Sequence, residues 1–169
     1  MHDFVGQGKI VAGTRANIAR RGVGVGVAVG APKLDISSVE AVKRTLLAAK
    51  TLAHSTGASA GVYFKSLLER LGIAEQTNAK LKPMPESTAA EAIMNGEADL
   101  LVAGNAETMV PGVQPVGLLP TELQNYIVFA AREVVATQHP EAAKDLIKFL
   151  AAAEAAQAIP AKGMEPAVP

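Results

Sequence analysis

The chain has 169 residues, of which 49% are hydrophobic and 19% charged, as in an ordinary globular protein. Lysine plus arginine total 16 and so do aspartate plus glutamate, and no basic cluster is interleaved with aromatic residues, so nucleic-acid binding is excluded. Cysteine is absent, which rules out disulfides and thiolate metal or redox sites. The length allows one domain or two small lobes.

The amino-terminal segment, residues 1–13, has no positively charged start followed by an apolar stretch, as an export signal would have. No apolar run anywhere is long enough to span a bilayer. We therefore expect no membrane insertion. A cytosolic protein and a mature or truncated chain without its signal both remain open.

The first strand is predicted at residues 22–30, GVGVGVAVG, where glycine or alanine alternates with valine. The spacing of these glycines contains no G-x-G-x-x-G motif, so it does not indicate dinucleotide binding. Ser37, with Glu40 three residues later, forms a capping-box pattern that predicts a helix ending near Ala49.

Residues 51–71 predict a short strand, a loop of small residues over 55–61 and an amphipathic helix. A helix start carries unpaired N–H groups and the positive end of the helix dipole, and small side chains let an anion reach them. The alternative is a tight strand-to-helix turn without a ligand. The candidate contacts in this segment are Ser55, Ser59, Ala60 and Gly61.

A further strand is predicted at residues 79–84, and Thr88 with Glu91 forms a second capping-box pattern. The helix that it opens precedes a strand at residues 98–104. Strands that alternate with helices in this way predict an α/β fold with a mainly parallel sheet and helices on both faces. Ligands of such sheets lie at the carboxyl ends of the strands, where residues 55–61 and 86–88 would meet.

The remaining segments are predicted to be extended at residues 113–120 and 125–133, then helical over 139–150 and 152–159. The second extended segment is almost continuously apolar, which predicts burial on both faces. Leu146 belongs to the apolar side of the first helix.

The titratable residues form no catalytic pattern. His2, His54 and His139 lack the spacing of metal ligands. Although His54 precedes Ser55, adjacent strand residues point to opposite faces and no G-x-S-x-G motif is present. We therefore interpret His54 as a partly buried residue at a strand end. The carboxylates stand at caps and turns without visible pairing, so we expect no enzymatic activity, no metal and no cofactor.

The order of motifs resembles that of molybdate-type periplasmic solute-binding proteins of ABC importers, which have the type II periplasmic-binding-protein fold. The resemblance rests on residues 8–15, 25–32, 60–63, 96–100, 126–129 and 161–166. It implies a two-lobed periplasmic protein that closes on a small oxyanion or organic acid and delivers it to an ABC permease.

The resemblance also implies a division of the chain and a set of contacts. Residues 1–22 would be a remnant of lobe one, 23–125 would form lobe two, and 126–169 would return to lobe one. The anion would lie in the interlobe cleft at helix starts, with the backbone N–H of Ala60 and the turn near Glu86 as contacts. The complete set of expected ligand-binding residues is Ser55, Ser59, Ala60, Gly61, Glu86, Ser87, Thr88, Ala103 and Tyr126.

Two features depart from that family. Ala103 stands where molybdate-binding members carry a tyrosine, so one hydroxyl donor is absent. Family members also begin with further elements of lobe one, and this chain starts after them. We expect its lobe-one segments to expose apolar helix faces and two chains to pair, for example by exchanging these segments. The alternative function is a homo-oligomeric structural or interaction module without transport.

Overall fold

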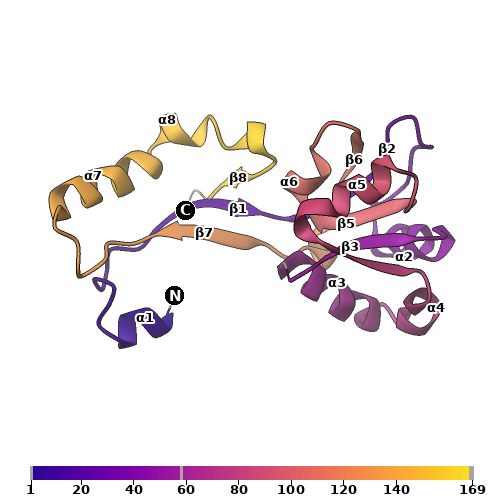
Figure 1. Cartoon of the computed structure of the whole chain (residues 1–169), viewed down its shortest axis with the longest axis horizontal. Helices are drawn as coiled ribbons and strands as arrows, with labels where there is room; N and C mark the ends of the chain where they lie inside the picture. The colour runs from indigo at the N-terminus through magenta and orange to yellow at the C-terminus, as the bar shows by residue number, and fades with distance from the viewer. Residues whose placement is uncertain (1, 58, 168–169) are drawn as a thin grey trace. The chain divides into compact units, whose positions relative to one another are not determined.

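The computed structural model describes residues 2–57 and 59–167 (Figure 1). The chain divides into two compact units. Unit 1 comprises Met1–Arg21 together with Val128–Pro169, and unit 2 comprises Gly22–Ile127.

Unit 2 contains a five-stranded sheet in the order β4-β3-β5-β2-β6. Its strands are β2 (Val23–Ala28), β3 (Leu52–Thr56), β4 (Leu81–Pro85), β5 (Leu100–Gly104) and β6 (Val113–Leu118). Strand β3 pairs in parallel with β4 and β5, whereas β2 is antiparallel to both of its neighbours. The predicted α/β fold with helices on both sheet faces is confirmed, with β2 running against the other four strands.

Helices cover both faces of this sheet (Figure 1). One face carries α2 (Val39–Ala48), α3 (Ser59–Arg70) and α4 (Ala74–Asn78), and the other carries α5 (Ala89–Met94) and α6 (Asn105–Thr108). The 3₁₀ turn η1 (Glu86–Thr88) leads into α5, and a second turn, η2 (Thr121–Leu123), follows β6.

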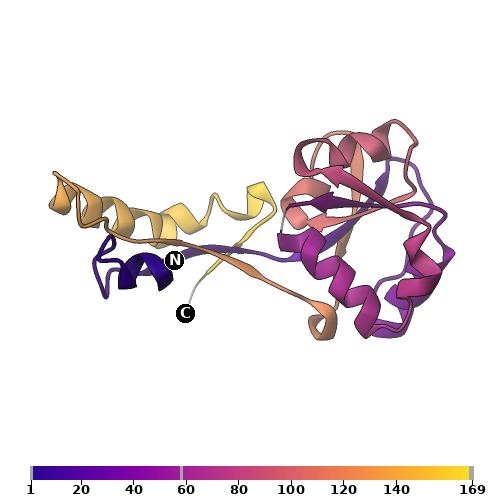
Figure 2. The same ribbon diagram turned by 60° about the horizontal axis from the view of Figure 1, so that its bottom comes forward.

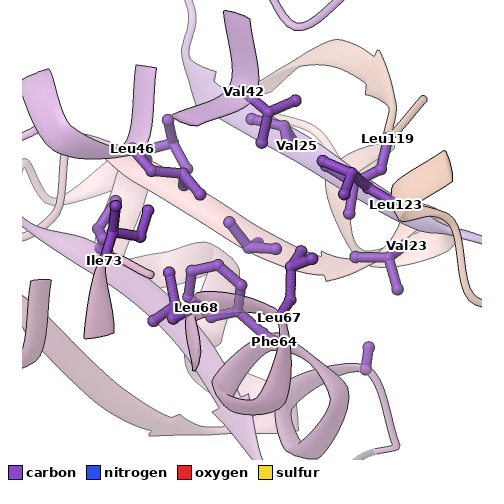
Figure 3. Packing of buried hydrophobic residues seen from close by; sticks show 14 residues of the cluster. Val23, Val25, Val42, Leu46, Phe64, Leu67, Leu68, Ile73, Leu119 and Leu123 are labelled. Carbon is purple, nitrogen blue, oxygen red and sulfur yellow. The ribbon is translucent and has the colours of Figure 1, made fainter. Parts of the chain in front are cut away.

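The core of unit 2 follows the alternation of side chains along its strands. Leu100 and Val102 of β5 pack toward α2 and α3, whereas Leu101 and Ala103 pack toward α5. Figure 3 shows the larger cluster, in which residues of α2 and α3, among them Phe64, meet the strands. All five of these residues are at most 1% exposed, so both faces of β5 are packed in the core.

The helix starts differ from the predicted capping boxes. Ser38, and not Ser37, caps α2, because its Oγ accepts the Ala41 N–H at 3.2 Å. The Ser37 hydroxyl instead donates to Asp35 at 2.7 Å. Thr88 makes no side-chain cap to α5, and its hydroxyl donates to the Pro85 carbonyl at 3.4 Å.

Unit 1 contains a three-stranded sheet in the order β7-β1-β8. Its elements are α1 (His2–Gly6), β1 (Ala16–Arg21), β7 (Ile127–Ala131), α7 (Pro140–Leu150), α8 (Ala153–Ala156), η3 (Pro160–Lys162) and β8 (Glu165–Pro166). Helices α7 and α8 run along one side of the strands in both views (Figure 2). None of the helices in the part of the chain that is described has the length and hydrophobicity to cross a bilayer.

Unit 1 has almost no core of its own. Among the described residues, Ala19 is its only buried hydrophobic side chain. The prediction that β7 is buried on both faces is wrong within one chain, because Val128 is 43% and Phe129 41% exposed on opposite faces. The prediction that the carboxyl-terminal helix exposes apolar residues is confirmed, since Leu146 and Phe149 of α7 are 56% and 61% exposed.

Candidate functional site

Three helix starts lie at one edge of the unit 2 sheet. Strands β3, β4 and β5 run in parallel, so their carboxyl ends share an edge, with Thr56 opposite Pro85 and His54 opposite Val102. Helix α3 begins shortly after β3, η1 directly after β4, and α6 directly after β5. The backbone N–H groups that begin these helices therefore lie beyond neighbouring strands, which is where open α/β sheets bind ligands.

The predicted residues after β3 fall into two groups. Ser59 is exposed in the first turn of α3. Ser55, Ala60 and Gly61 are buried, and Ala60 is part of the larger core cluster. Of these residues, only Ser55 and Ser59 carry a side-chain hydroxyl, so Ala60 and Gly61 can offer a ligand only their backbone groups.

Gly61 sets the distance between α3 and β3. A β-carbon at this position would lie 1.6 Å from the carbonyl oxygen of Ser55, so no other residue fits without moving the backbone. The same atom would lie 3.4 Å from Nδ1 of His54. The small-residue loop therefore has a packing role, in which glycine lets the first turn of α3 lie directly on the end of β3.

Two buried polar side chains adjoin this contact. The Ser55 hydroxyl is fully buried and has no hydrogen-bond partner among the described residues. His54 is 1% exposed, which makes it more buried than expected, and neither ring nitrogen makes a well-formed hydrogen bond to the described residues, although the ring lies beside the Ser55 backbone. Burial lowers the pKa of His54; the Ser55 backbone opposes this shift and the Lys65 charge adds to it. The imidazole is thus neutral near pH 7.

The turn after β4 supplies the second group of predicted residues. Glu86 and Ser87 are exposed and Thr88 is half-buried, all within η1. The hydroxyl of Thr56 donates to the carbonyl of Met84 at 3.1 Å, which links the end of β3 to the end of β4. The two predicted contact segments are therefore neighbours in the structure.

Ala103 and Tyr126 differ in what they can offer. The Ala103 side chain is fully buried in the cluster beneath α5, so it presents no group to the edge. Tyr126 is 37% exposed. Two residues earlier, the side-chain oxygen of Gln124 accepts the N–H of Val23 at 2.6 Å, and Val23 pairs with Gly104 at the end of β5.

A cavity of about 340 Å³ lies between the end of β3 with the loop after it and one side of α3, from Gly61 to Glu69. Ser55 and Gly61 line it, together with Lys65 and Glu69, one helical turn apart. The two opposite charges offset each other. Attraction for an anion must therefore come from helix N–H groups and the Ser55 hydroxyl.

Sequence reasoning missed part of this edge. Lys65 lies on the polar side of the predicted amphipathic helix, and this pattern gives no sign that it lines the cavity. The start of α6 also lies at this edge, and the N–H of Gly104 donates to Glu107 at 3.2 Å. The pair of a strand-ending glycine and a glutamate three residues later was the available signal. The described residues contain no cluster of three potential metal ligands.

The chain is similar to the aconitate isomerase of a Pseudomonas species, with 35% identity over 165 residues. The alignment covers 96% of this chain and 63% of that enzyme, so the chain spans less than two thirds of its relative. This relative overturns the sequence-based expectation of no enzymatic activity, because a similar protein carries the name of an enzyme.

Solved structures share the fold. A substrate-binding domain assigned to a molybdenum ABC transporter of Clostridium difficile superposes with a TM-score of 0.84 at 15% identity, covering 98% of this chain and 72% of that one. The periplasmic molybdate-binding protein of Azotobacter vinelandii gives 0.71 at 19% identity, with coverages of 99% and 74%. PEB3 with bound L-phospholactate gives 0.67 at 12% identity, with coverages of 93% and 70%.

The family model of the bacterial extracellular solute-binding proteins matches residues 1–165. That match takes in both units and the edge at which α3, η1 and α6 begin. The chain belongs to the family of bacterial extracellular solute-binding proteins.

Proposed function

We propose that the chain binds a small anion at the start of α3, within the cavity lined by Ser55, Gly61 and Lys65. The observation that carries the proposal is the Ser55 hydroxyl, which is fully buried at this point without a partner among the described residues. A buried hydroxyl without a partner is unfavourable unless a ligand or a water completes it. The N–H groups at the start of α3 supply further donors.

An organic carboxylate is a better candidate for the ligand than molybdate. The relative at 35% identity is named for aconitate, whereas the molybdate-binding structure is 19% identical. Ala103 has no hydroxyl, so the tyrosine donor of the molybdate-type pattern is missing. As a member of a solute-binding family, the chain would carry the anion in the periplasm and deliver it to an ABC permease.

Titration calorimetry tests this proposal with cis-aconitate, trans-aconitate, molybdate and sulfate as probes. We expect saturable binding of an aconitate and a weaker or absent response to molybdate. Ser55→Ala removes the buried hydroxyl, so it should weaken the affinity about tenfold while the thermal stability stays equal or rises. Ser66→Ala, on the same cavity but exposed, is the matched control. Equal affinities of Ser55→Ala and the wild type would contradict the site.

A second candidate function is isomerisation of an aconitate-like carboxylate, favoured by the 35% identity over 96% of this chain. Such a reaction removes a proton from one carbon and returns a proton to another while the double bond moves, and it needs no oxidant. Proton NMR of cis-aconitate in D₂O would show the trans isomer and incorporated deuterium. Binding without either change would assign the chain to solute binding alone.

We also propose that the chain forms a homo-oligomer. The apolar surface of unit 1 favours pairing of two chains, either beside each other or by exchange of segments. A structural or interaction module without a ligand is the outcome if none of the four anions binds.

A further inference from the structure

An apolar recess of unit 2, larger than the cavity beside α3, lies at the opposite end of its sheet. A cavity of about 570 Å³ opens between the carboxyl-terminal half of α2, the loop after β2 and the turn between α5 and β5. This is the edge at which β3 and β5 begin and β2 ends. The cavity is therefore separate from the start of α3, and the inference drawn from it is independent of the proposed function.

The walls of this cavity are made of small residues over an apolar floor. Ala31, Ala48 and Gly96 leave the space open, and Ile93 and Leu100, each 1% exposed, lie at its base. The volume falls in the range of small-molecule sites, which are mostly apolar with a few polar groups. Water gains few hydrogen bonds there, so an apolar group of a ligand would displace it favourably.

The charged groups at the rim favour an anion. Arg44 and Lys50 line the cavity, and both are exposed. The guanidinium of Arg44 lies 3.7 Å from Asp35, and both side chains are more than 60% exposed, so this ion pair is weak. The Asp35 carboxylate is already bonded to the N–H and hydroxyl of Ser37. Arg44 can therefore turn its donors to a ligand at little cost.

The rim also carries one acidic group, so the two cations that line the cavity exceed its carboxylates by one. Asp99 lines the cavity, but its Oδ2 accepts the N–H groups of Lys50 and Thr51 at 2.8 and 3.0 Å. Its Oδ2 is thus occupied by the backbone at the start of β3, while its charge remains. The rim keeps a net positive charge above an apolar recess, a combination that matches a hydrocarbon chain with a terminal carboxylate.

We propose that this cavity is a second binding site, which takes an amphipathic monocarboxylate with its hydrocarbon part among the alanines and its carboxylate at Arg44. Octanoate is the probe. Octylamine has the same chain with the opposite charge, and acetate has the same charge without the chain. Titration calorimetry of the 169-residue chain should give saturable binding of octanoate and none of the other two.

Variants separate this cavity from other surfaces. Arg44→Gln removes a charged bidentate donor and should weaken octanoate binding about tenfold, whereas Lys43→Gln, on the same helix but outside the cavity, should leave it unchanged. Ala48→Phe and Ala31→Leu fill the cavity from opposite walls and should abolish binding. Two filling variants are used so that one remains if the other fails to fold.

Four outcomes would each overturn the proposal. The first two are that octanoate shows no saturable binding or that octylamine binds equally well. The other two are that Arg44→Gln and Lys43→Gln lose the same affinity or that a folded cavity-filled variant keeps full affinity for octanoate. Ser55→Ala must leave octanoate binding unchanged, because Ser55 lies at the other edge of the sheet. A loss of octanoate binding in Ser55→Ala would assign octanoate to the anion site and overturn the second site alone.

Discussion

Gly61 is the residue on which the geometry at the start of α3 depends most directly. A methyl group there would meet the Ser55 carbonyl at 1.6 Å, and a backbone oxygen cannot rotate away as a flexible side chain can. We expect Gly61→Ala to lower the free energy of unfolding by about 3 kcal/mol, as in overpacked cores, because α3 must move off β3. Urea unfolding followed by circular dichroism measures this change.

Val62→Ala is the matched control for that experiment. Val62 neighbours Gly61 on α3 and is 67% exposed, so its truncation should change stability by no more than about 0.5 kcal/mol. If Gly61→Ala were as stable as this control, the close contact between α3 and β3 would be wrong.

His54 gives unit 2 a pH dependence with a defined sign. Burial holds the pKa of His54 below that of the unfolded chain, so the unfolded state takes up a proton first as the pH falls. Stability should therefore be constant above about pH 7 and decline below the ordinary histidine pKa of about 6.5. His54→Leu should remove this decline and preserve stability at pH 7.5, since it also removes two buried nitrogens that make no well-formed hydrogen bond to the described residues.

The control for His54 is His139→Gln, which replaces an exposed histidine and should retain the decline. Thermal unfolding between pH 7.5 and 5.5 separates His54 from the carboxylates, because hydrogen bonds to Ser37 and Lys144 hold the pKa values of Asp35 and Glu141 below their ordinary range. Protonation of these two carboxylates therefore affects stability only at lower pH. An unchanged decline in His54→Leu would contradict the assignment.

The sequence predicted the positions of two residues near the start of α3 but not their roles. The sequence indicated Ser55 and Gly61 through the run of small residues, but their roles differ in the structure. Glycine is required at position 61 because a β-carbon would meet the Ser55 carbonyl, whereas the Ser55 hydroxyl has no hydrogen-bond partner among the described residues. Neither property has a local pattern, because both depend on how α3 crosses β3. Lys65 was overlooked for the same reason.

At the scale of a single helix, the N-cap of α2 can be assigned by comparing variants of Ser38 and Ser37. Ser38 accepts the Ala41 N–H, so Ser38→Ala should cost about 1 kcal/mol of stability. Ser37 donates its N–H and hydroxyl to the exposed Asp35, so Ser37→Ala should change stability by no more than about 0.5 kcal/mol. Parallel urea titrations of the two variants compare these costs. Equal or reversed costs would favour the cap predicted from sequence.

Long elements were easier to predict than short ones. Helices α2 and α3 span 10 and 12 residues, enough for a repeated apolar face to be recognised. Helices α4 and α6 have five and four residues, too few for such a pattern, and were missed. The cap of α2 was displaced by one residue because two adjacent serines both fit an N-cap.

At the scale of the whole molecule, the sequence correctly indicated apolar surface on α7, because the periodic face of that helix had no predicted partner. It incorrectly indicated full burial of β7, because a continuous apolar run was interpreted as a central strand. In the structure β7 is an edge of its sheet, with apolar side chains exposed on both faces. Pattern alone does not reveal whether the neighbour that buries a strand belongs to the same chain.

The exposed apolar residues of unit 1 predict self-association. Leu146 and Phe149 lie three residues apart on α7 and share one face of the helix, and unit 1 contributes one buried hydrophobic residue among those described. We expect sedimentation at micromolar concentration to give a dimer or larger oligomer. Leu146→Glu combined with Phe149→Glu should shift the population toward monomer, because two charges cannot be desolvated cheaply at an apolar interface. Lys148→Gln, on the charged side of α7, should leave the oligomer intact. A wild-type chain that sediments only as a monomer would exclude this pairing.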